Sequence, residues 1–186
     1  MNYKDYKKSR DLAWEVLIQE KVCELPVKIT KICKNRGIAV KYWEGLPDDI
    51  DGLSTIIKGK PYILLNPNRP ISRQRFTTAH ELGHILLGHI GNNMHINREQ
   101  DNSKPEEQAA NSFAARLLAP ACVLWGCNVK TAEEIATLCG ISNQAAEIRA
   151  ERMKELYKRQ KFMTSPLEQE VYTLFKDFIN LRREDR

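Results

Sequence analysis

The feature that most constrains the fold is the stretch "RFTTAHELGHILLGHIG", residues 75–91, which holds three of the four histidines of the chain. His80 and His84 flank Glu81 in the order H-E-x-x-H, inside an apolar segment with no helix breaker between the histidines. Side chains four residues apart share a helix face, so the two imidazoles would aim at one point, as two metal ligands do. Glu81, about 100 degrees round the helix from His80, would lie beside the metal without ligating it. The motif alone leaves two alternatives, a metal site or a buried helix with satisfied histidines.

A catalytic zinc site needs a third ligand from the protein. The pattern H-E-x-x-H-x-x-G-x-x-H would supply a third histidine, but Leu87 and Ile90 occupy its glycine and histidine positions. His89 is one residue early, and on a continuing helix it would point about 100 degrees away. The sequence therefore disfavours a third histidine ligand.

The other common solution takes a glutamate from a following helix, which the segment "EEQAANSFAARLLA" predicts. Glu106 and Glu107 are both available, 22 and 23 residues past His84. Glu107 is preferred because Asn111, four residues on, shares its face and could orient a ligand through its amide. Glu106 has capping-box spacing with Ser103. The alternative for either glutamate is an ordinary first-turn acidic residue favoured by the helix dipole.

The rest of the chain predicts an α+β fold, with a small antiparallel sheet packed on helices. "IAVKYWEG" is rich in β-formers, and "LSTIIKGKPYILLN" is typical of two short strands joined by a hairpin. Apolar residues recur at helical spacing near both ends of the chain. A helix-turn-helix pattern surrounds Gly140, and a last amphipathic helix is expected over 165–183.

Composition excludes few classes of protein. The net charge of +5 is a mild excess that does not by itself indicate a nucleic-acid partner. No apolar run is long enough to span a bilayer, and the charged N-terminus lacks the apolar core of a signal peptide. The expected location is therefore the cytoplasm.

At these motifs the sequence resembles the ImmA/IrrE-like metallopeptidases. The resemblance rests on "FTTAHELGHILLGH" followed by "EEQAANSFAARLLAP", with "DGLSTIIKGKPYILLN" upstream and "TAEEIATLCGIS" downstream, and covers roughly residues 25–155. It implies a minimal zincin-like core with one Zn²⁺, held in the gluzincin manner by His80, His84 and Glu107, with Glu81 as the catalytic residue. Asn111 falls where the family has Asn or Asp.

The resemblance further implies a zinc endopeptidase that cleaves a transcriptional repressor of the helix-turn-helix type and so switches on mobile-element or stress genes. The expected division is a metallopeptidase domain over 1–125 and a helical region over 126–186. Three residues are candidates for oxyanion or substrate contacts: Tyr62, His89 and His95.

Two competing functions stay open from the sequence. One is a regulator that binds DNA directly through residues 131–151, which Arg149 and two acidic residues in the second helix disfavour. The other is a protein that holds zinc and binds a repressor without cleaving it, as in a toxin–antitoxin pair. The oligomeric state is open.

Overall fold

The structure, a computed structural model, describes residues 3–90 and 104–184. By their internal contacts the residues form two compact units, one of residues 1–10 and 28–114 and one of residues 11–27 and 115–186. In chain order the elements are α1 (Tyr3–Gln19), α2 (Ile29–Asn35), β1 (Ala39–Tyr42), β2 (Gly52–Ile57), β3 (Lys60–Leu65), α3 (Ile71–Leu87), α4 (Pro105–Leu118), α5 (Ala121–Gly126), α6 (Ala132–Cys139), α7 (Asn143–Lys158), α8 (Pro166–Leu174) and α9 (Lys176–Glu184). The predicted α+β class is confirmed.

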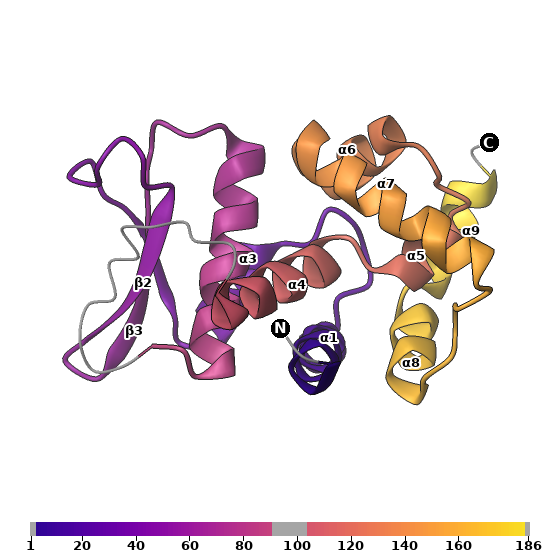
Figure 1. The fold of residues 1–186 in the computed structure, drawn as a ribbon, viewed down its shortest axis with the longest axis horizontal. Coiled ribbons are helices and arrows are strands. Elements are labelled where there is room, and N and C mark those ends of the chain that lie inside the picture. The colour runs from indigo at the N-terminus through magenta and orange to yellow at the C-terminus, as the bar shows by residue number, and fades with distance from the viewer. Residues whose placement is uncertain (1–2, 91–103, 185–186) are drawn as a thin grey trace. The chain divides into compact units, whose positions relative to one another are not determined.

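The sheet of the first unit has three strands in the order β1-β3-β2. Figure 1 labels two of them, β2 and β3. The predicted hairpin is confirmed, since β2 and β3 are antiparallel and joined by Lys58 and Gly59, both at positive φ as a type I′ turn requires. However, β1 pairs with β3 in parallel, so the sheet is mixed rather than purely antiparallel. The connection over residues 43–51 joins β1 to β2, and these two strands lie on opposite sides of β3. As a result β2 is an edge strand.

The motif helix α3 packs on one face of this sheet (Figure 1). Ser54 and Ile63 are register partners and share the face toward α3, whereas Leu53 and Leu64 on the other face join a cluster with Leu46 and Ile50. A Cβ at Gly52 would lie 2.7 Å from Thr77 Cγ2 of α3, so the glycine permits this close packing. Pro70 precedes α3, and no side chain caps the start of this helix.

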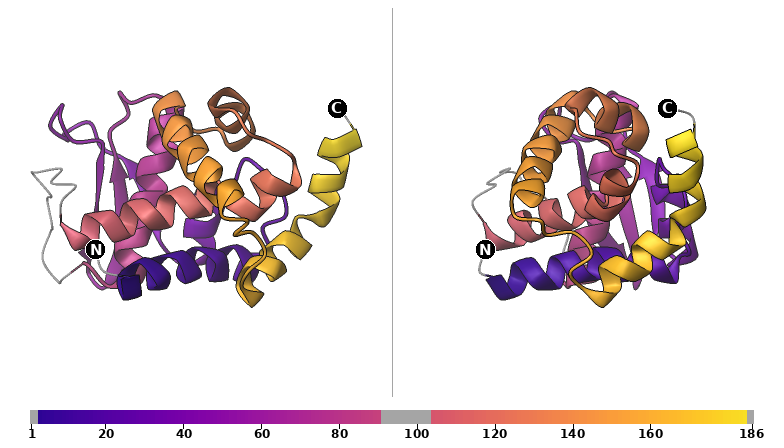
Figure 2. Two further views of the ribbon diagram at one scale, coloured as in Figure 1. Left: turned by 45° about the vertical axis from the view of Figure 1, so that its right-hand side comes forward. Right: turned by 90° about the vertical axis from the view of Figure 1, so that its right-hand side faces the viewer.

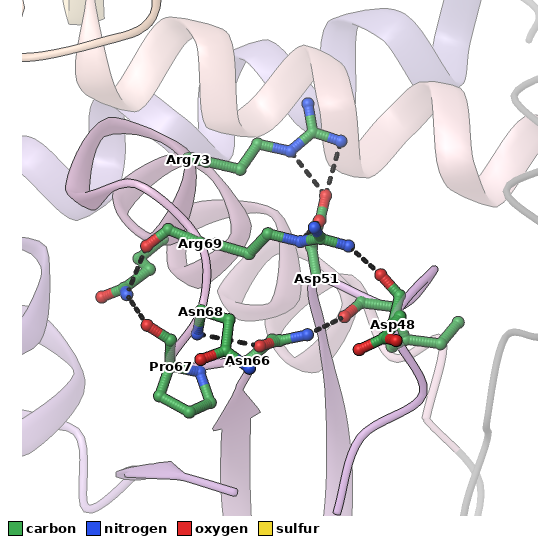
Figure 3. A network of polar contacts seen from close by, with 9 residues as sticks. Asp48, Asp51, Asn66, Pro67, Asn68, Arg69 and Arg73 are labelled. Carbon is green, nitrogen blue, oxygen red and sulfur yellow. Dashed lines mark hydrogen bonds and ion pairs between the residues drawn. The ribbon is translucent and has the colours of Figure 1, made fainter. Parts of the chain in front are cut away.

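A network of polar contacts joins the start of β2 to the start of α3 (Figure 3). Asp51 forms ion pairs with Arg69, at 2.6 Å, and with Arg73, at 2.5 Å. Asn66 adds a backbone hydrogen bond to the Asp51 carbonyl at 2.9 Å and a side-chain bond to the Ile50 carbonyl at 3.1 Å. The network therefore fixes the register of the edge strand immediately before Gly52.

We expect Asp51→Asn to lower the free energy of unfolding by about 1–2 kcal/mol, since it leaves two guanidinium groups without their carboxylate while both remain partly exposed to water. Urea denaturation followed by circular dichroism measures this loss. Asp48→Asn is the matched control, because Arg69 contacts only the backbone carbonyl of Asp48. An equal loss in both variants would show that the carboxylate of Asp51 has no special role.

The second unit contains the predicted helix-turn-helix hairpin, drawn in orange as α6 and α7 (Figure 2). Thr131 and Glu134 form a capping box at the start of α6, and Gly140 ends that helix in the left-handed conformation. The expected single terminal helix is instead two helices, α8 and α9, because the backbone leaves the helical conformation at Phe175. None of the described helices combines the length and apolar character needed to cross a bilayer.

Candidate metal centre

Two helices of the first unit bring the candidate ligands together. His80 and His84 lie one turn apart on α3, and Glu107 lies in the first turn of α4. The two Nε2 atoms are 3.0 Å apart, and each lies near a different carboxylate oxygen of Glu107, at 3.2 Å from His80 and 3.3 Å from His84. One donor atom from each of the three residues falls within 4.8 Å of the others, the one such group of at least three His, Cys, Asp or Glu among the described residues.

This donor set fits a zinc ion. Two imidazole nitrogens and one carboxylate form a common catalytic combination, and ligands at about 2.0–2.1 Å from a tetrahedral zinc lie roughly 3.3 Å from one another. The measured separations of 3.0–3.3 Å are close to that spacing. The side chains of His84 and Glu107 are only 7% and 9% exposed, so the three donors converge in a place that water reaches from few directions.

Small residues make this convergence possible. A Cβ at Gly83 would lie 3.3 Å from Ala110 Cα and 3.0 Å from the ring of Phe113, so α3 and α4 touch almost backbone to backbone. Ala110 follows Glu107 by one helical turn and lies on the same side of α4. A larger residue at either position would push Glu107 away from the histidines.

Asn111, one helical turn after Glu107, contacts His80 on the side of the ring that faces away from Glu107. Its Oδ1 lies 2.9 Å from His80 Nδ1. An amide oxygen only accepts hydrogen bonds, so Nδ1 of His80 carries a proton, and with a metal in place of the Nε2 proton the lone pair of Nε2 would face the shared point. This is the arrangement in which a neutral imidazole ligates a metal.

The electrostatics of the site favour a cation. Burial alone would raise the pKa of Glu107, but its hydrogen bonds with His80 and His84 outweigh burial and hold that pKa far below the usual range. Burial would lower the pKa of His80, yet the hydrogen bond to Glu107 and the charges of Glu81 and Glu107 raise it. The carboxylate of Glu107 therefore stays ionised beside two imidazoles.

Glu81 lies beside this group and is held by the edge strand. Ser54 Oγ of β2 donates a hydrogen bond of 2.6 Å to Glu81 Oε2, and both residues are buried. This bond engages Oε2 of the Glu81 carboxylate and not Oε1. Ser54 was missed by sequence reasoning, because a strand–helix contact across 27 residues leaves no local signal.

A pocket with a volume of about 280 Å³ opens beside these residues. Its walls include Gly52, Leu53 and Ser54 of β2 together with Glu81, His84 and His89. Among the described residues, the site thus lies next to the β2 edge of the sheet.

The structure separates the three candidates for oxyanion or substrate contacts. His89 lines the pocket, and its Nδ1 lies 3.1 Å from His84 Nδ1. Burial, with a contribution from His84, lowers the pKa of His89. Tyr62 is not brought to the site, because it pairs with Thr55 and so lies on the sheet face opposite Ser54 and Glu81. His95 and the expected cap Ser103 lie outside the described residues.

The exposed side chains of the helix-turn-helix hairpin are of mixed chemistry, and they include Asn143 and Gln144 at the start of α7. Arg149 is buried, with 6% of its surface exposed, and cannot serve as an outward cation. The outward residues of α7 include Glu147, Glu151 and the exposed Ile148. Two carboxylates on this face would repel the phosphate backbone of DNA.

Comparison with known proteins agrees with the geometry. A search of curated protein sequences gives no significant match. Among solved structures, a Mycobacterium tuberculosis transcriptional regulator is similar with a TM-score of 0.53 and 13% identity, over 88% of this chain and 52% of that one. This likeness concerns the fold, and the chain spans about half the length of that regulator. The family model of the IrrE N-terminal-like domain, peptidase M78, matches residues 33–151. This match covers more than half of the chain, which therefore belongs to the peptidase M78 family of IrrE N-terminal-like domains.

Proposed function

We propose that this chain is a zinc-dependent endopeptidase that acts in the cytoplasm on a helix-turn-helix transcriptional repressor. The observation that carries the proposal is the convergence of His80 Nε2, His84 Nε2 and the Glu107 carboxylate at zinc-like separations, with Glu81 alongside. Membership of a peptidase family supports the reaction class. The repressor as substrate rests on the resemblance to the ImmA/IrrE-like enzymes.

In this proposal His80, His84 and Glu107 hold the metal, and the chain's own residues manage the proton. A bound Zn²⁺ supplies Lewis-acid polarisation of a peptide carbonyl and lowers the pKa of water. Glu81 Oε1 accepts a proton from the attacking water and returns it to the leaving amine nitrogen. Ser54 occupies Oε2 and so restricts rotation of the carboxylate, which keeps Oε1 directed into the pocket.

The edge strand suggests how an extended peptide could bind. Within residues 3–90 and 104–184, β2 pairs with β3 alone, and its residues Gly52 to Ser54 form a wall of the pocket. A peptide that adds to this edge would gain backbone hydrogen bonds and run past Glu81 and His84.

The experiment is cleavage of the full-length repressor encoded by a neighbouring gene. We expect zinc-loaded protein to produce two discrete fragments by intact-mass spectrometry. A chelator should abolish cleavage, and added zinc should restore it.

Stable binding without fragments would instead favour a zinc-holding partner protein. If a diverse peptide library also stays intact with zinc present, the peptidase proposal fails. Retention of specific DNA without cleavage would favour the regulator.

A further inference from the structure

His89 makes a contact that sequence spacing does not suggest. Its imidazole meets that of His84 edge-on, with ring centroids 5.1 Å apart and planes at 69°, and the two Nδ1 atoms lie 3.1 Å apart. Nε2 of His84 meanwhile points to Glu107 and His80. His89 therefore contacts the side of the His84 ring that faces away from the point where the donors converge.

The end of α3 produces this contact. Gly88 takes the left-handed conformation, with φ of 79°, and the helix does not continue. The His89 backbone N–H then donates to the His84 carbonyl at 2.9 Å, which turns residue 89 back onto the last helical turn. A continuing helix would have directed His89 away from His84.

The tautomers follow from hydrogen-bond chemistry. Two facing ring nitrogens need one proton between them. His84 can ligate through Nε2 only when that atom has no proton, and a neutral imidazole then carries its proton on Nδ1. His84 Nδ1 is therefore the donor and His89 Nδ1 the acceptor. Asn111 Oδ1 does the same for His80, so each histidine that faces Glu107 has its own acceptor behind it.

We propose that His89 is a positioning residue that accepts a hydrogen bond from His84 Nδ1 and holds His84 in its metal-binding tautomer and orientation. The inference rests on the metal site of the proposed function but not on the peptidase reaction. His89 acts through His84 and does not touch the metal. Partners of this kind raise the basicity of a histidine ligand and fix its ring.

Zinc affinity measured with a chromophoric chelator, without any substrate, tests the proposal. We expect His89→Phe, which keeps a ring but removes the acceptor, to weaken zinc binding by roughly 10–100-fold. His89→Asn keeps an acceptor near the position of Nδ1 and should restore affinity to within a few-fold of wild type. Asn111→Leu is the matched loss on the other histidine and should resemble His89→Phe. Wild-type affinity in His89→Phe, or an equal loss in His89→Phe and His89→Asn, would overturn the proposal.

A second measurement needs no variant and so does not depend on whether a variant folds. In zinc-loaded wild-type protein, long-range ¹H–¹⁵N spectra should show His84 protonated on Nδ1, and His89 protonated on Nε2 with a free Nδ1. A proton on His89 Nδ1 would contradict the assignment. If wild-type protein binds no zinc, the metal site and the role of His89 fail together. If it binds zinc but cleaves nothing, only the peptidase proposal fails.

Discussion

Glu81→Gln is expected to lower kcat for repressor cleavage by roughly 10²–10⁴-fold, the usual contribution of a general acid–base residue. The amide cannot accept the proton that Glu81 Oε1 would take, yet it has nearly the same size and can keep the hydrogen bond from Ser54. Zinc content and the free energy of unfolding should stay near wild type, because Glu81 is not among the three converging donors. Fragment release by mass spectrometry and metal analysis of the same sample measure both quantities.

Ser54→Ala separates the position of Glu81 from its chemistry. This variant keeps the carboxylate but removes the donor to Oε2, so its kcat should fall less than that of Glu81→Gln. If Glu81→Gln cleaves at the wild-type rate with zinc bound, Glu81 does not transfer the proton, and the proposed mechanism is wrong.

The parts of the fold that local spacing controls could be predicted from the sequence. The four-residue separation of His80 and His84 places both on one helix face, and the structure directs both Nε2 atoms to one point. The hairpin at Lys58 and Gly59 was likewise readable from its turn residues. The parallel partner of β1 was not, because the alternation of apolar residues says which segments are strands but not which strand lies beside which.

Contacts between residues that lie far apart in the sequence could likewise be predicted only in part. Glu107 could be singled out because the face it shares with Ala110 and Asn111 is small and polar, and the structure packs that face against Gly83. His89 was set aside as a metal ligand on the assumption that the helix continued, and it was kept as a candidate oxyanion or substrate contact. Gly88, a typical helix-ending residue, was the signal that this assumption would fail. Strand alternation places Tyr62 on the face opposite Ser54, but the sequence does not show which face meets α3, so Tyr62 could not be set aside from the sequence.

The ligand from α4 can be tested with two adjacent glutamates as a matched pair. Loss of a residue that hydrogen-bonds to a metal ligand weakens metal binding by roughly 10–100-fold. Glu107→Gln removes a ligand itself, so it should weaken zinc binding by more than this. Glu106→Gln should bind zinc like wild type, because Glu106 is exposed and the histidines face Glu107. Both substitutions remove one negative charge from the same helical turn, so a difference between them cannot arise from net charge or from the helix dipole.

The same pair predicts a difference in metal-linked stability. At a free zinc concentration of 100 times the wild-type Kd, binding stabilises the folded protein by about 2.7 kcal/mol. Wild type and Glu106→Gln should gain this amount in urea denaturation, and Glu107→Gln should gain almost none. The comparison is made with and without zinc for each protein, because Glu107→Gln also alters contacts with His80 and His84 in the metal-free state. If Glu107→Gln keeps the full zinc-dependent gain, the third ligand lies elsewhere, and the close packing of α4 on Gly83 has only a structural role.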